Sequence, residues 1–241
     1  VKKNSMPSYI ALPITAALIY AIKLFYFKDD AMLLNATAAS GLVSTLTPIT
    51  VIFGAIMFNR MMETTGCIDI IRKWLATISP NPVAQLMIIG WSFAFMIEGA
   101  SGFGTPAAIA APILMSLGFN PLKVAIFTLV MNSVPVSFGA VGTPTWFGFA
   151  PLNLSAENIL AIGRQTGVMH FFAGFVIPVI GLSFIVPWSE IRKNLGFIGI
   201  AVFSCTIPYV ALAMVNEEFP SLVAGAIGLL VSVFAAKDRK S

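Results

Sequence analysis

Long apolar runs separated by short polar stretches occupy most of this 241-residue chain. A helix needs about 20 consecutive apolar residues to cross a bilayer core, and several runs reach that length. The pattern predicts spans over residues 9–27, 32–58, 156–187, 195–215 and 219–236. We therefore expect an all-α polytopic membrane protein, with residues 1–241 forming a single transmembrane domain.

Residues 66–79 differ from these runs, because their apolar and polar side chains fall on opposite faces of a helix. The apolar face carries Ile68, Ile71, Leu75 and Ile78, and the polar face carries Asp69, Arg72, Lys73 and Thr77. This separation is typical of a helix that lies in the membrane interface.

Residues 83–117 are too many for one span and too few for two complete ones, so a re-entrant helical hairpin is a third alternative. If they cross an even number of times, only Lys23, Lys28 and Arg164 fall on one side of the membrane. The other side then holds Lys2, Lys3, Arg60, Arg72, Lys73, Lys123, Arg192, Lys193, Lys237, Arg239 and Lys240. Basic residues collect in short cytoplasmic loops, so we expect even crossing with both ends of the chain cytoplasmic. The glycine-rich centre favours the hairpin. Residues 121–152 then form one broken transmembrane helix.

The stretch from Phe95 to Pro106 places Glu98 and three glycines inside an apolar run. A charge at the membrane centre costs at least about 2.5 kcal/mol and is usually functional. Backbone left unpaired by glycines must lie within protein or beside a wet cavity. A buried polar site is the natural interpretation. The alternatives are a turn carboxylate satisfied by neighbouring N–H groups and glycines that serve only helix packing.

A short motif occurs twice, as Gly104-Thr105-Pro106 and as Gly142-Thr143-Pro144. Proline suits the first turn of a helix, so we expect each motif to open a half-helix. The N-terminal ends of half-helices present free N–H groups and a positive dipole to anionic substrates near the midplane of transporters. Two such ends could face one carboxylate.

Composition limits the classes of function. The chain is 58% hydrophobic and 10% charged with a net charge of +4, which indicates an integral membrane protein and gives no reason to expect nucleic-acid binding. Cys67 and Cys205 match no metal or redox spacing, and His170 is the single histidine. We expect His170 to have a packing role, although it could carry a proton. No nucleophile motif or cofactor signature accompanies Glu98, so we expect no enzyme, no cofactor and no metal.

Several segments resemble the lactate permeases of bacteria and archaea. They are Asp69–Arg72, Glu98–Pro106, Leu117–Pro121, Asn132–Pro135 with Phe138–Gly142, and Gly163–Gln165. The resemblance implies proton-coupled uptake of L-lactate, D-lactate and glycolate. It also implies two inverted repeats, each with a hairpin and a broken helix, that move substrate by an elevator-like shift. Family members are about twice this length, so the resemblance implies that the chain is a fragment holding one repeat.

These arguments together select candidate residues for binding a small carboxylate. They are Glu98, Gly99, Ser101, Gly102, Gly104, Thr105, Asn132, Gly139, Gly142, Thr143 and Arg164, with Glu98 as the candidate proton carrier. Arg164 has an equal alternative as a helix-end arginine that extends to the interface. Two other functions stay open at this stage, a sodium-coupled carboxylate carrier and a membrane scaffold subunit that transports nothing. The sequence also leaves a homo-oligomer open.

Overall fold

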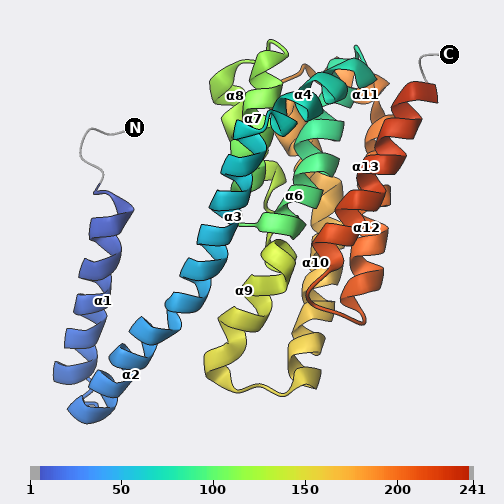
Figure 1. Ribbon diagram of the computed structural model, residues 1–241. Coiled ribbons are helices and arrows are strands. Elements are labelled where there is room, and N and C mark those ends of the chain that lie inside the picture. The colour runs from blue at the N-terminus through green and yellow to red at the C-terminus, as the bar shows by residue number, and fades with distance from the viewer. Residues whose placement is uncertain (1–5, 239–241) are drawn as a thin grey trace. The chain divides into compact units, whose positions relative to one another are not determined.

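The computed structural model describes residues 6–238, and every regular element in that range is a helix. The chain divides into two compact units, residues 1–60 and residues 61–241, which are described separately (Figure 1). Lys2, Lys3, Arg239 and Lys240, which entered the comparison of the two membrane sides, lie outside the described residues.

The first unit contains α1 (Ser8–Phe25), α2 (Ala31–Ser44) and most of α3 (Leu46–Thr64). Lys23 pairs with Asp29 at 2.7 Å in the turn after α1, and the Asp30 carboxylate caps α2 by accepting from the Met32 N–H. The predicted span over 32–58 consists of two helices that meet at Thr45, and Ala31–Thr50, which crosses this junction, is a candidate membrane span. Pro48 lacks the N–H that would bond the Ser44 carbonyl, so the α-helical ladder is interrupted there.

The second unit begins with α4 (Cys67–Ile78), the amphipathic helix. Leu75 and Ile78 are buried, and Ile68 and Ile71 pack against the same core. The polar face includes Lys73, which is exposed, whereas the side chain of Arg72 lies outside what the structure describes.

Residues 82–116 form a helical hairpin with unequal arms. The first arm runs without interruption through α5 (Pro82–Met87), the π-helix η1 (Ile88–Phe93) and α6 (Ala94–Ser101), and most of its residues are buried. The chain reverses at Gly102–Gly104, and the second arm, α7 (Thr105–Ser116), packs back against η1 and α6 (Figure 1). Pro82–Ser101 is long enough to cross a bilayer by itself, whereas α7 is not.

The next stretch is the predicted broken helix. It consists of α8 (Pro121–Met131), the 3-10 turn η2 (Pro135–Phe138), α9 (Gly139–Phe149) and the 3-10 turn η3 (Ala150–Leu152). The two parts bend by 61° at the break. Pro135 cannot donate a backbone hydrogen bond, which is one local reason for the interruption.

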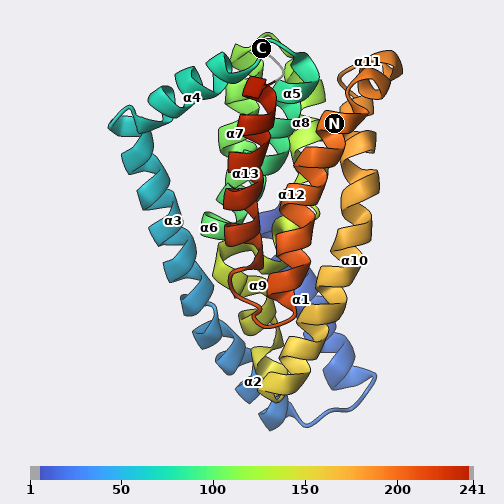
Figure 2. The same cartoon turned by 90° about the vertical axis from the view of Figure 1, so that its right-hand side faces the viewer.

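Long helices then form the frame of the second unit: α10 (Ala156–Ser183), α12 (Leu195–Ala213) and α13 (Pro220–Asp238), which lie side by side in Figure 2. Small residues permit this close approach, since a Cβ on Gly167 would lie 2.7 Å from Ala213 and one on Gly174 would lie 2.6 Å from Thr206. The span predicted to Pro187 ends at Ser183, and a short separate helix, α11 (Trp188–Lys193), precedes α12.

Five helices in the described part of the chain are long and apolar enough to cross a membrane, and the bent pair is a sixth candidate. The protein is therefore an all-α, multi-pass membrane protein.

Candidate functional site

Glu98 lies on α6, one turn before the tip of the hairpin, and is 1% exposed. Its carboxylate points at Gly139, the first residue of α9, so closely that a Cβ on Gly139 would collide with Oε1. Gly139 has an ordinary backbone conformation, with φ of −68°. Glycine is therefore required there because Glu98 occupies the space, and the hairpin carboxylate meets the break of the second helix.

Asn132 lies at the end of α8, on the other side of the break, and its side chain interacts with the Glu98 carboxylate. Two oxygen atoms here, Glu98 Oε2 and Asn132 Oδ1, are buried and have no hydrogen-bond partner. Buried polar atoms without partners are rare and call for an explanation, such as a proton, an ion or a water. This pair is therefore the strongest candidate for a functional site.

The tip of the hairpin packs on the unwound turn of the broken helix. A Cβ on Gly102 would lie 2.8 Å from the Ala140 Cβ and 2.9 Å from the Ala140 nitrogen. Glu98 and Gly102 are one helical turn apart, and they meet the consecutive residues Gly139 and Ala140. The two interruptions therefore form one contact region.

The repeated Gly-Thr-Pro motif has nearly the same backbone geometry in both places. Gly104 has φ 79° and ψ 4°, Gly142 has φ 73° and ψ 9°, and a helical turn starts at the following threonine in each case. Glycine adopts this left-handed conformation without steric cost, which explains its position before each half-helix.

The turn before the second motif is strained. Ala140 and Val141 both adopt left-handed conformations, with φ of 45° and 52°. Such a conformation costs about 1–2 kcal/mol for a non-glycine residue, and a β-branched residue there is an outlier. Strain of this kind clusters at functional and switching segments.

Side chains satisfy the carbonyl groups that the break frees. Within the segment, the Thr143 hydroxyl donates to the Ala140 carbonyl at 2.6 Å, and the Thr145 hydroxyl donates to the Ser137 carbonyl at 2.9 Å. From neighbouring helices, the Tyr209 hydroxyl donates to the Val134 carbonyl and the Ser221 hydroxyl donates to the Pro135 carbonyl. Irregular backbone at this depth is tolerated because protein groups replace the missing helical donors.

The structure brings several of the predicted residues together at this contact region: Glu98, Gly102, Asn132, Gly139, Gly142 and Thr143. Gly142 packs on the loop after α12, since a Cβ there would lie 2.5 Å from the Glu217 carbonyl oxygen. Gly104 is exposed with open space around its Cα, and Thr105 beside it is half-buried.

Three predicted residues have other contacts. Gly99 lies against the backbone of Leu222 on α13, so it is a packing glycine. The Ser101 hydroxyl donates to the Ile97 carbonyl within its own helix. Arg164 is exposed, and its Nε donates to the Met214 carbonyl at 2.8 Å, which ties α10 to the end of α12.

Sequence reasoning missed Tyr209 and Ser221, and it gave His170 no partner. Tyr209 and Ser221 are fully buried, and His170 Nδ1 lies 2.7 Å from the Tyr209 hydroxyl oxygen. In the sequence, Tyr209 and Ser221 are isolated hydroxyl groups within or beside apolar runs, and this pattern does not show which groups accept their hydrogen bonds.

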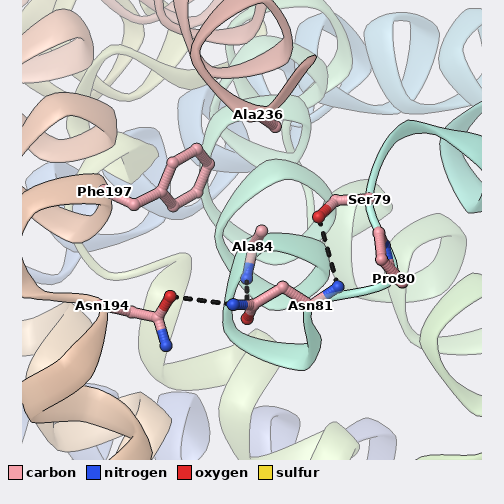
Figure 3. A pocket seen from close by; sticks show the side chains of 7 residues that line it. All are labelled: Ser79, Pro80, Asn81, Ala84, Asn194, Phe197 and Ala236. Atoms are coloured by element: carbon pink, nitrogen blue, oxygen red, sulfur yellow. Dashed lines mark hydrogen bonds between the residues drawn. The ribbon is translucent and has the colours of Figure 1, made fainter. Parts of the chain in front are cut away.

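A separate cavity of about 210 Å³ lies where α5, α12 and α13 meet (Figure 3). Its amides are paired, because Asn81 Nδ2 donates to Asn194 Oδ1 at 2.9 Å and Asn81 Oδ1 caps α5. Asn81 and Asn194 therefore connect the beginnings of α5 and α12, which is a structural role. Among residues 6–238, no group of three or more His, Cys, Asp or Glu side chains is placed to hold a metal ion.

Comparison with known proteins matches the sequence of this chain to one family. A family profile described as L-lactate permease matches residues 1–240. A putative L-lactate permease of Haemophilus influenzae is 61% identical over 98% of this chain and 44% of its own length. The L-lactate permease of Escherichia coli K12 is 30% identical over 95% of this chain and 41% of its own length. The glycolate permease GlcA of the same organism is 34% identical over 81% of this chain and 33% of its own length. The chain thus spans less than half the length of these curated relatives. No solved structure matches it.

Proposed function

Because this chain belongs to the L-lactate permease family, we propose that it forms part of a secondary transporter that takes up lactate and related 2-hydroxy monocarboxylates, such as glycolate, with protons. The family consists of transporters and not of enzymes. The observation that carries the proposal is the buried Glu98 carboxylate, which faces an interrupted helix and has an unpartnered oxygen.

Substrate binding is assigned to the contact region of the hairpin and the break. A carboxylate near the beginnings of α7 and α9 would lie at the positive ends of two half-helices. Gly104 leaves the backbone at the start of α7 open to close approach, and Thr105 and Thr143 follow the glycines of the two motifs. The paired geometry of the two motifs supports this assignment.

Proton coupling is assigned to Glu98. An ionised Glu98 would repel a substrate carboxylate, and removal from water favours the neutral form of a carboxyl group. Substrate therefore binds best when Glu98 is protonated, and the binding of proton and substrate becomes reciprocal. A protonated Glu98 also needs fewer hydrogen-bond donors around it than the carboxylate does, which suits the unpartnered Oε2.

A sodium-coupled carrier is the second candidate, and one observation favours it. Glu98 Oε2 and Asn132 Oδ1 are both acceptors without donors, and such oxygens can bind a cation as well as a proton. Replacing sodium by choline in an uptake assay separates the two. Uptake that persists in choline and follows an imposed pH gradient supports proton coupling.

The orientation in the membrane is also a proposal. The unequal distribution of lysine and arginine supports a cytoplasmic position for both ends of this chain. A homo-oligomer is compatible with the exposed apolar faces of the helices. Labelling of single cysteines near each end, from either side of the membrane, tests the orientation.

The deciding experiment measures labelled lactate entering proteoliposomes that contain the native gene product. Saturable uptake that is driven by an inward proton gradient, abolished by a protonophore and inhibited by glycolate supports the proposal. A scaffold subunit predicts no saturable uptake or binding of any small carboxylate, and that result would refute a transport function.

A further inference from the structure

Two consecutive carbonyl groups in the break are held by hydroxyl groups from two other helices. The Tyr209 hydroxyl on α12 donates to the Val134 carbonyl at 3.2 Å, and the Ser221 hydroxyl on α13 donates to the Pro135 carbonyl at 2.6 Å. Both side chains are 0% exposed. The break therefore has a defined shape that depends on groups 75 and 86 residues away in the chain.

His170 provides a second contact for the Tyr209 hydroxyl, since its Nδ1 lies 2.7 Å from the hydroxyl oxygen. The Tyr209 ring also packs edge-on against Phe95 and lies against Phe138, which limits its movement. The hydroxyl is held in place from both ends of the side chain.

The first turn of α13 touches both walls of the site. Ser221 holds the break, while the backbone of the next residue, Leu222, lies directly against Gly99, the neighbour of Glu98. One turn further along, Gly225 lies against the backbone of Met96. Because no side chain separates α13 from α6, the position of Ser221 determines where the break lies relative to Glu98.

We propose that Tyr209 and Ser221 are positioning residues, whose hydroxyl groups hold the segment from Asn132 to Gly139 in register with Glu98. They act through the carbonyls of Val134 and Pro135. The consequence for transport rests on the proposed function, whereas the consequence for the shape of the break does not.

The test compares Ser221→Ala with Ser232→Ala in the native gene product. Both serines are fully buried on α13, but the partner of Ser232 is the Ser92 hydroxyl at 2.9 Å, away from the break. Tyr209→Phe, which keeps the ring, is the second variant. Thermal unfolding midpoints show whether the two serine variants lose similar stability.

We expect amide hydrogen exchange across residues 133–142 to be faster in Ser221→Ala and Tyr209→Phe than in the parent protein, and unchanged in Ser232→Ala. We also expect the KM for lactate exchange to rise about fivefold to tenfold in the first two variants only, as the loss of one hydrogen bond suggests. Ser221→Thr, which keeps the hydroxyl, should restore part of the lost affinity.

Equal amide exchange across residues 133–142 in Ser221→Ala, Tyr209→Phe and Ser232→Ala would overturn the positioning role. Faster exchange in the first two variants with an unchanged KM would overturn its link to the substrate site. If the parent protein does not transport lactate, the proposed function fails, and the amide exchange data still decide whether the hydroxyls shape the break.

Discussion

The Glu98 carboxylate occupies the space that a side chain on Gly139 would need. The two residues come from different interrupted elements, the hairpin arm α6 and the second half of the broken helix. Because the two residues are in contact, a change in the charge or the position of Glu98 acts directly on the backbone of the break.

Gly139→Ala is therefore expected to abolish or strongly reduce lactate transport. Alanine can adopt the backbone conformation of Gly139, so the effect of the added methyl group comes from its collision with Glu98. Gly148→Ala, in the same helix but with open space around it, is the matched control and should transport normally. The shorter Glu98→Asp side chain should partly restore folding and substrate exchange in the double variant. Normal transport by Gly139→Ala alone would contradict the close contact.

Glu98→Gln is expected to exchange lactate across the membrane without accumulating it against a gradient. Glutamine resembles the protonated carboxyl group, so substrate still binds, but no proton is released or taken up. The pH dependence of lactate affinity should largely disappear. Counterflow and gradient-driven uptake in the same vesicles measure the two activities. Glu190→Gln, on the short helix α11 outside the contact region, is the control. Uphill uptake with an unchanged pH profile would exclude Glu98 as the proton carrier.

Gly142→Ala and Gly104→Ala are expected to differ in severity, although both glycines have left-handed backbones. A methyl group on Gly142 would meet the Glu217 carbonyl and the Glu218 Cα, whereas one on Gly104 would enter open space. Gly104→Ala should therefore cost only the backbone strain, about 1–2 kcal/mol, and Gly142→Ala more. Thermal midpoints in detergent measure this order. The larger Gly104→Val and Gly142→Val changes should each stop transport while leaving membrane insertion intact.

Gly118→Ala separates strain from position in this comparison. Gly118 also has a positive φ, 94°, and open space, but it lies in the turn between α7 and α8. It should lose about as much stability as Gly104→Ala and keep the lactate KM of the parent. A raised KM in Gly118→Ala would show that backbone strain outside the two Gly-Thr-Pro motifs also impairs binding.

Val141→Gly is expected to raise the thermal midpoint. Glycine relieves about 1–2 kcal/mol of left-handed strain, and its greater freedom in the unfolded chain offsets about 0.5–1 kcal/mol of that gain. Val136→Gly, in the right-handed turn η2, should instead destabilise the protein. If strain at Val141 belongs to a transport step, the stabilised variant should also exchange lactate more slowly. A lower midpoint for Val141→Gly would contradict the strained conformation.

The local pattern of the sequence was sufficient to predict the helical class, the hairpin, the broken helix and the two half-helix starts. These features depend on local sequence. The length of an apolar run determines whether a helix can cross the membrane, and the glycine and proline of each Gly-Thr-Pro motif determine the backbone conformation at the start of the half-helix. Glu98 could be recognised as a candidate functional residue for the same reason, because a carboxylate inside an apolar membrane segment is costly and is usually functional. The predicted division of basic residues between the two sides of the membrane stays a prediction.

Only the tertiary structure decided which neighbours these elements have. Gly99 and Gly139 look alike in the sequence, yet one packs on the backbone of Leu222 and the other makes room for Glu98. The rotation of a helix about its axis is set by packing against distant helices, and sequence spacing does not contain it. The hydroxyls of Tyr209 and Ser221 find their acceptors 75 and 86 residues away for the same reason. A broken helix can be predicted from its own residues, but the groups that satisfy its free carbonyls come from the fold.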